Sequence, residues 1–262
     1  PGELHDGGYS FGQIIGTATV GDYGGIQAAG ATASDFNAAG ISAGDVYELY
    51  TPGQLSAAGY SFIDIILASP GTDYAAIQAA GAFAVDFHDA GVPSASLAGV
   101  YSSLEIVGAG YADVPNLDWS LFGNTDILSA ANAFERVSAA GDVTFTAETT
   151  LELAFDGAGS SVDWGDSFWS SGHAWNILDV AGTTYGVERL SIAQKDWIDS
   201  RGHALSSFRP YATFSLSLDP ANGKNLLVVY SVPEPSTFVQ LLLGGGLATW
   251  GWRRGVRRRQ RA

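Results

Sequence analysis

Two hydrophobic periods divide the chain into two kinds of sequence. Up to about residue 112, single large apolar residues such as Ile26 and Phe36 stand among alanine, glycine and polar residues. From Val143 to Phe155, apolar residues alternate with threonine and glutamate, which predicts a strand or a bent pair of strands buried on one side. We therefore expect an α+β fold: an N-terminal array of short helices, then an antiparallel or solenoid-like β region.

A duplication with an offset of 51 residues underlies the helical part. Gly8-Tyr9-Ser10-Phe11 returns as Gly59-Tyr60-Ser61-Phe62, and the six residues 26–31 return unchanged as 77–82. A third copy begins at Gly110-Tyr111 and then fades. Repeats of this kind bury their apolar faces by stacking on their neighbours.

A shorter unit of about ten residues recurs inside the duplication. It reads alanine, glycine, usually an apolar residue and a hydroxyl, with an aspartate three residues later; the copies are Ala29-Gly30-Ala31-Thr32 with Asp35, Ala39-Gly40-Ile41-Ser42 with Asp45, and Ala58-Gly59-Tyr60-Ser61 with Asp64. Glycine suits the left-handed residue that ends a helix, and the hydroxyl and carboxylate suit a capping box on the next helix. Thr51-Pro52-Gly53-Gln54 and Ser102-Ser103-Leu104-Glu105 fit the same scheme. Each junction therefore ends one helix and starts the next.

Helices of the expected seven or eight residues are too short to be stable alone, so they must stack. The expected core of the array is Ile14, Ile15, Ile26, Phe36, Leu49, Leu55, Ile65, Ile66, Ile77 and Phe87. The array resembles the Ala-Gly-aromatic-Ser decapeptide repeats of some bacterial surface proteins. That resemblance implies no chemical function.

Further strands are expected in the C-terminal half. Trp175 to Val180 is one candidate, and 211–218 and 225–232 form a hairpin around the turn Asp219-Pro220-Ala221-Asn222-Gly223. Asp126 to Ala140 is expected to be a helix that links the two halves. The stretch 161–169, with 214–216 and 226–230, resembles the end of an autotransporter-type β-helix passenger, which implies a β-solenoid cap or a small β-sandwich and no chemistry.

Candidate catalytic side chains are few. Gly8-Tyr9-Ser10-Phe11-Gly12 matches the nucleophile elbow of serine hydrolases, but no buried strand precedes it and Ser61 repeats the serine at a cap position, so capping is favoured. The histidines have no metal-ligand spacing, and cysteine is absent. We therefore expect no enzyme activity, no cofactor and no metal.

A patch of tryptophans with His173 leaves two interpretations open. Trp164, Asp166, Trp169 and His173 could form a catalytic or glycan-stacking cluster, since aromatic faces and carboxylates suit sugars. The favoured interpretation is a set of core tryptophans beside solvated turn carboxylates. The pair Asp163 and Asp166 could also bind Ca²⁺ through oxygen ligands, although no EF-hand or related loop pattern is present.

The last thirty residues have three parts. First comes the proline motif of Val232, Pro233, Glu234, Pro235, Ser236 and Thr237; then an uncharged apolar run over 238–252; then a tail with Arg253, Arg254, Arg257, Arg258, Arg259 and Arg261. The prolines keep the motif extended. A helix over the run would cover roughly 22 Å, short of the ~30 Å hydrocarbon core, and snorkelling arginines would extend it. The arginines would anchor this end in the cytoplasm.

This arrangement resembles the PEP-CTERM sorting signal. The resemblance implies export, processing near the motif by an exosortase-type membrane transpeptidase, and display in the envelope or extracellular matrix. An ordinary tail anchor is the alternative interpretation. The expected domains are a short-helix repeat domain (1–112), a connecting segment (113–139), a β-rich domain (140–231) and a sorting signal with a single transmembrane helix (232–262).

Charge and composition limit the classes of molecule that the protein is expected to bind. The net charge is −15, and six of the 12 basic residues stand in the tail, so the remainder is more acidic still and would repel nucleic acid. Methionine is absent even at position 1, so we expect a fragment or a processed form of an exported protein. The expected role is structural or adhesive, with exopolysaccharide as a candidate partner. The alternative is a fragment of a carbohydrate-binding or carbohydrate-active β-domain protein.

Overall fold

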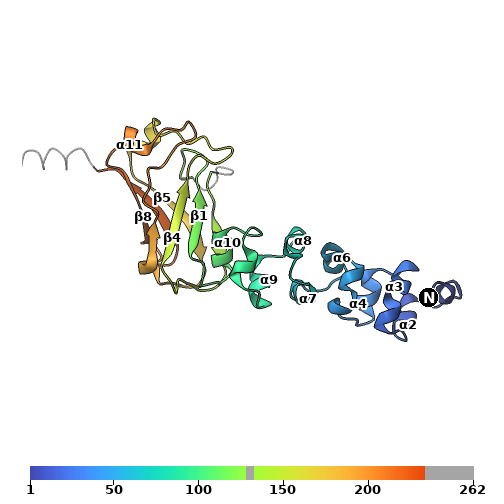
Figure 1. The fold of residues 1–262 in the computed structure, drawn as a ribbon. Helices are drawn as coiled ribbons and strands as arrows, with labels where there is room; N and C mark the ends of the chain where they lie inside the picture. Colours follow the sequence, from blue (N-terminus) through green and yellow to red (C-terminus); the bar gives the residue numbers. More distant parts are fainter. Residues whose placement is uncertain (128–132, 234–262) are drawn as a thin grey trace, which may run out of the picture. The chain divides into compact units, whose positions relative to one another are not determined.

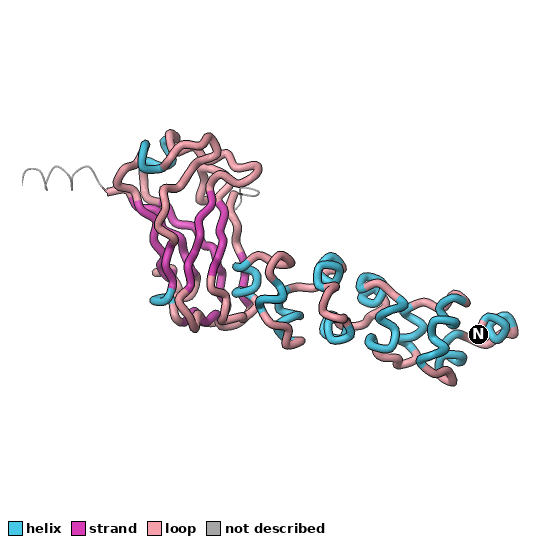
Figure 2. The backbone as a smooth tube through the Cα atoms, viewed as in Figure 1, coloured by secondary structure: helices cyan, strands magenta, loops and turns pink. Residues whose placement is uncertain are grey.

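The computed structural model describes residues 1–127 and 133–233 of the chain (Figure 1). Contacts divide the chain into two compact units. Of the described residues, the first unit comprises 1–117, 137–149 and 180–189, and the second comprises 118–127, 133–136, 150–179 and 190–233. Helices dominate the first unit and strands the second (Figure 2).

The first unit is an array of short helices. Its helices are α1 (Gly2–Asp6), α2 (Phe11–Ile15), α3 (Tyr23–Ala28), α4 (Ala33–Ala38), α5 (Ala43–Val46), α6 (Pro52–Ala57), α7 (Phe62–Ala68), α8 (Tyr74–Ala79), α9 (Ala84–Asp89) and α10 (Ser103–Gly108), with 3₁₀ turns at η1 (Val20–Asp22), η2 (Tyr47–Leu49), η3 (Ser94–Leu97) and η5 (Val187–Arg189). Helices two apart in sequence pack together: α2 on α4, α4 on α6, α6 on α8, α5 on α7 and α7 on α9. Because no helix of this length is stable alone, this stacking holds the array together.

The predicted helix junctions are confirmed in most copies. Gly30 has φ +106°, and the N–H of Ala31 donates to Ile26 O at 3.3 Å, which closes the end of α3. Thr32 then caps α4, because its N–H donates to Asp35 Oδ2 at 2.8 Å while its hydroxyl accepts from the Asp35 N–H. The same glycine geometry recurs, among other positions, at Gly40 and Gly59. The capping box does not follow at every junction: Ser61 accepts from the Asp64 N–H at 3.1 Å without a closed box, and Ser42 makes no side-chain cap bond to α5.

The expected core of the array is largely correct. Nine of the ten expected residues are buried, and Phe36 and Phe87 are fully enclosed. Leu49 is the exception, because it lies in η2, where Tyr47 and Tyr50 turn inward instead.

Equivalent aromatic side chains enclose the two buried phenylalanines. Phe36 makes edge-on contacts with Tyr23 and Tyr50, at ring distances of 5.2 and 5.9 Å. Phe87 does the same with the tyrosines 51 residues further on, at 5.2 and 5.7 Å. Such contacts stabilise a core beyond the area that they bury.

Short strands complete the first unit. They are β2 (Val137–Ala139), β3 (Val143–Thr144) and β6 (Thr184–Tyr185). β3 pairs with β6 in parallel, and β2 packs against α10.

The second unit contains two sheets. One has the order β1 (Asn116–Ser120), β4 (Thr149–Ala154), β7 (Leu190–Ile192), and Figure 1 shows β1 and β4 side by side. In the other, β9 (Leu226–Ser231) lies between β5 (His173–Val180) and β8 (Thr213–Leu218) and is antiparallel to both. The unit also contains η4 (Ser167–Ser170) and α11 (Leu205–Phe208). The predicted hairpin over 211–232 is confirmed, with Leu218 opposite Leu226.

One prediction about local structure is confirmed and one is wrong. The alternating run from Val143 to Phe155 forms the bent pair of strands that its pattern allowed: it is split into β3 and β4, because Phe145 N bonds to Tyr185 O while the chain turns at Thr146–Glu148. The predicted linking helix over 126–140 is not a helix where it is described; residues 128–132 lie outside the described part, and β2 occupies its end. Phe134 pairs with Leu121 in an antiparallel bridge, so tertiary pairing overrides local helix propensity.

The membrane part of the expected fold class is corrected. Among the described helices the longest, α7, has 7 residues and covers about 10 Å. None of the described helices is therefore long and apolar enough to cross a bilayer. The expected transmembrane run over 238–252 lies outside the described residues.

Candidate functional site

The final strand of the second unit leads directly into the proline motif. Ser231, the last residue of β9, pairs with Thr213 of β8. Val232 follows half-buried and Pro233 is exposed. Pro233 has no N–H to donate, so strand pairing cannot continue through it. The other predicted sorting residues (Glu234, Pro235, Ser236 and Thr237) and the six predicted anchor residues (Arg253, Arg254, Arg257, Arg258, Arg259 and Arg261) lie outside the described residues.

Tyr230 fixes the end of β9 in the core. Its side chain is fully buried, and its hydroxyl donates to Trp169 O at 3.0 Å. Burial raises the pKa of Tyr230 to about 12, because the phenolate form would lose its hydration. The motif therefore begins two residues after a firmly held position.

The predicted tryptophan patch is part of the core. Trp164, Trp169 and Trp175 have no exposed surface, and Trp164 meets Trp169 edge-on at 4.5 Å. Each indole N–H donates to a protein oxygen: Trp164 to Trp197 O, Trp169 to Asn124 Oδ1 and Trp175 to Thr125 O. Enclosed rings offer no face to a sugar, so these three tryptophans are not a glycan platform.

His173 joins this core through both ring nitrogens. Nδ1 lies 2.9 Å from Asp126 Oδ2, and Nε2 lies 2.6 Å from Phe168 O. The imidazole stacks on the Phe168 ring with centroids 3.7 Å apart. A histidine held in this way orders a loop and has no nitrogen left for a substrate.

Asp163 and Asp166 each shape a turn. Asp163 accepts from the Gly165 N–H at 2.9 Å and pairs with Arg201 at 2.7 Å. Asp166 caps η4 by accepting from the Phe168 N–H at 2.8 Å. Within the described residues, no group of three or more acidic or histidine side chains could hold a metal ion.

Asp199 is a buried carboxylate that the sequence pattern did not single out. It accepts from the N–H groups of Trp164, Arg201 and His203, at 3.2, 2.9 and 2.8 Å. Burial alone would raise its pKa, but these three donors outweigh burial, and the pKa lies below the ordinary value. The one sequence feature that could have indicated a tight turn here is Gly202, three residues after Asp199, which has a positive φ.

Ser10, the candidate nucleophile, is a helix cap. Its hydroxyl accepts from the Gln13 N–H at 3.3 Å, and Gln13 Oε1 accepts from the Ser10 N–H at 3.0 Å. This capping box starts α2. The favoured interpretation of the serine motif is confirmed.

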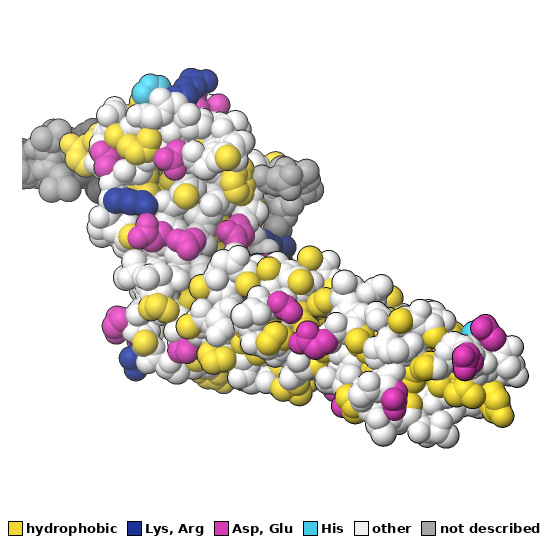
Figure 3. Space-filling view, turned by 45° about the vertical axis from the view of Figure 1, so that its right-hand side comes forward, with side chains coloured by type: hydrophobic (Ala, Val, Ile, Leu, Met, Phe, Trp, Pro, Cys, Tyr) yellow, Lys and Arg dark blue, Asp and Glu magenta, His cyan; other side chains and the backbone are white. Residues whose placement is uncertain are grey.

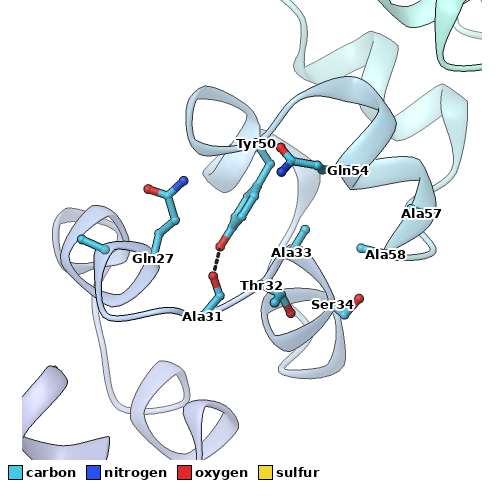
Figure 4. Close-up of a pocket in the computed structure, with 10 residues that line it drawn as sticks. Gln27, Ala31, Thr32, Ala33, Ser34, Tyr50, Gln54, Ala57 and Ala58 are labelled. Atoms are coloured by element: carbon cyan, nitrogen blue, oxygen red, sulfur yellow. Dashed lines mark hydrogen bonds between the residues drawn. The ribbon is translucent and has the colours of Figure 1, made fainter.

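A groove in the first unit presents amide and hydroxyl groups. It has a volume of about 550 Å³ and is lined by parts of α3, α4 and α6 (Figure 4). Gln27, Thr32 and Gln54 lie on its wall, and the Tyr50 hydroxyl donates to Ala31 O across it at 2.7 Å. Each of these groups already bonds within the array: Gln27 Nε2 donates to Leu49 O at 2.6 Å, the Thr32 hydroxyl donates to Asp35 Oδ2 at 2.7 Å, and Gln54 Oε1 accepts from the Thr51 N–H at 2.9 Å. A hydroxyl-rich ligand would meet only the hydrogen-bonding capacity that these bonds leave unused.

The second copy has different side chains at the positions that form the edge of the groove in the first. Thr32 and Ser34 are replaced 51 residues later by Phe83 and Val85, which are 72% and 43% exposed. The positions that are polar at the groove edge in the first copy are therefore apolar and exposed in the second.

Comparison with known proteins supports a sorting function at the C-terminus. No curated protein and no solved structure matches the chain. The comparisons do not show the expected likeness to an autotransporter passenger. The PEP-CTERM protein-sorting motif matches residues 231–259. The chain thus carries a PEP-CTERM signal, which supports an exported protein that exosortase sorts to the cell envelope or beyond.

Proposed function

We propose that this exported protein is a non-catalytic component of the cell surface or extracellular matrix, with a structural or adhesive role. The observation that carries the proposal is that every candidate catalytic side chain caps a helix or bonds to another part of the protein. Ser10 caps α2, Asp166 caps η4, and both nitrogens of His173 contact protein oxygens. Acidic side chains scattered over the face in view, with few basic ones, favour solubility outside the cell (Figure 3).

Exosortase processing is tested with intact-mass analysis in a host that carries the enzyme. We expect a product that has lost the arginine tail, with the cut near Pro233–Pro235. The control is a variant with Pro233→Ala, Glu234→Ala and Pro235→Ala, which leaves β9 untouched and should keep the tail. A tail retained by the parent chain in that host would refute the proposed processing.

Absence of catalysis is tested on purified residues 1–231. A screen against ester, peptide and polysaccharide substrates should give no turnover. The control is the triple variant Ser10→Ala/Asp166→Ala/His173→Ala. Turnover that is present in the parent and lost in this variant would overturn the non-enzymatic proposal.

Exopolysaccharide is the proposed matrix partner, and the polar groove between α3, α4 and α6 is the feature that favours it. The same groove is the observation that favours the second candidate function, a carbohydrate-binding role. The chain itself provides the control, because Phe83 and Val85 stand where Thr32 and Ser34 stand in the first copy. Thr32→Phe/Ser34→Val should keep the fold and abolish binding on a glycan array. Glycan binding unchanged by these substitutions would exclude the groove.

A further inference from the structure

The first helix of the array repeats two later ones. α1 ends 51 residues before α6 ends and 102 before α10 ends, and the glycines that follow them, Gly8, Gly59 and Gly110, have φ of +94°, +94° and +102°. The chain therefore ends all three helices in the same way.

Two side chains on this repeated helix and turn become buried in the later copies. Leu55 and Ile106 are 0% and 4% exposed, and Tyr60 and Tyr111 are each 8% exposed. Each tyrosine hydroxyl also reaches back to a turn carbonyl nineteen residues earlier: Tyr60 donates to Ile41 O at 3.0 Å, and Tyr111 donates to Val92 O at 2.7 Å.

The same positions are open in the first copy. Leu4 is 49% exposed and Tyr9 is 54% exposed, although both match the later copies in size and type. Glu3 also stands where Gln54 and Glu105 close capping boxes on the residues before their helices. We call the surface formed by Glu3, Leu4 and Tyr9 the leading face.

We propose that the leading face is a docking surface for a further short-helix unit of the same repeat, one of whose turn carbonyls accepts a hydrogen bond from Tyr9 Oη. The argument is continuity with the interface inside the array. In the second copy, α6, which carries Leu55, packs against the preceding α4 as well as against α7 and α8, and the turn at Ile41 accepts a hydrogen bond from Tyr60. The leading face presents the same side chains at the same spacing, so a unit of that type fits it.

The test adds one repeat to the full chain. A copy of residues 1–51 is placed ahead of Pro1, so that the added Thr51 precedes Pro1 as the natural Thr51 precedes Pro52. Leu4→Ala is then introduced at the original Leu4 in the natural and the extended chains, with Leu55→Ala as the reference for a buried site.

We expect the urea midpoint of the natural chain to change little with Leu4→Ala. In the extended chain the same substitution should lower the midpoint nearly as much as Leu55→Ala does. Tyr9→Phe should follow the same pattern with a smaller shift. Leu4→Ala and Tyr9→Phe leave all later units intact, so loss of the whole fold would not be confused with the result.

Two results would overturn the proposal. One is an equal, small effect of Leu4→Ala in both chains, which would show that an added unit does not cover the face. The other is a dimer of the natural chain in sedimentation that Leu4→Ala or Tyr9→Phe dissociates, which would assign the face to a second copy of the chain.

Discussion

At the scale of single residues, backbone conformation decides which glycines are required. Gly40 has φ +76° at the end of α4, whereas Gly12 lies inside helix α2. A Cβ atom at either position would meet no heavy atom within 4 Å. Both sites therefore have room for a Cβ atom, and they differ only in backbone conformation.

We predict opposite effects of alanine at these two glycines. Gly40→Ala should lower the free energy of unfolding by about 1–2 kcal/mol, because the left-handed conformation strains a residue with a Cβ atom. Gly12→Ala should raise it by about 0.5–1 kcal/mol through helix propensity. Urea unfolding followed by far-UV circular dichroism measures both. Effects of the same sign would contradict the junction geometry.

A second residue-scale prediction concerns alkaline pH. Because the folded pKa of Tyr230 is raised to about 12 from an ordinary value near 10, its contribution to stability is complete below about pH 10. That contribution should fall by about 1.4 kcal/mol per pH unit as the pH rises from about 10 to 12. Tryptophan fluorescence reports this transition, since the described tryptophans lie in the second unit.

The matched variant is Tyr230→Phe. It loses the hydroxyl bond to Trp169 O and should be less stable than the parent at neutral pH by about 1 kcal/mol. It should also lose the part of the alkaline slope that comes from Tyr230. A slope unchanged in the variant would mean that other groups, such as Tyr111 in the first unit, dominate alkaline unfolding.

At the scale of the elements, much of the helical array could be predicted from sequence, because its information is local. A hydroxyl, an acidic or amide residue three positions later and a glycine at the end suffice to place the boundaries, as at Thr32, Asp35 and Gly40. The hydrogen bonds from tyrosine hydroxyls to turn carbonyls were not predictable, because each joins residues that are nineteen positions apart in sequence. Among the strands, β1, β2, β6 and β7 were missed, since their pairing depends on distant residues more than on local pattern.

The tyrosine bonds between turns give the element-scale prediction. Tyr50 is buried and donates to Ala31 O at 2.7 Å. Tyr50→Phe should lower the free energy of unfolding by about 1 kcal/mol, because the carbonyl loses its partner and the ring remains. Tyr9→Phe is the control, with an expected change near zero at an exposed ring. Equal losses in the two variants would contradict a bridging role.

At the scale of the whole molecule, the sorting motif directly follows β9, a core strand of the second unit. The tail motif was predictable because its three parts follow one another in sequence. Its structural context was predictable only in part: the turn at 219–223 predicted that the last strand pairs with β8, but no local pattern predicted its pairing with β5. Leu226, Val228 and Tyr230 of this strand are fully buried. A cut within the proline motif leaves the whole of β9 in the product.

Two truncations test this division. A chain that ends at Ser231 should keep the tryptophan fluorescence and the urea midpoint of the second unit, because every residue that pairs in β9 is retained. A chain that ends at Lys224 should lose cooperative unfolding of that unit, since β5 and β8 lose the strand between them and a row of buried side chains. The first unit provides the internal control, and its helical signal should survive in both chains. If the chain ending at Lys224 still unfolded cooperatively by tryptophan fluorescence, β9 would be dispensable, and the position of the sorting motif directly after it would have no consequence for the processed protein.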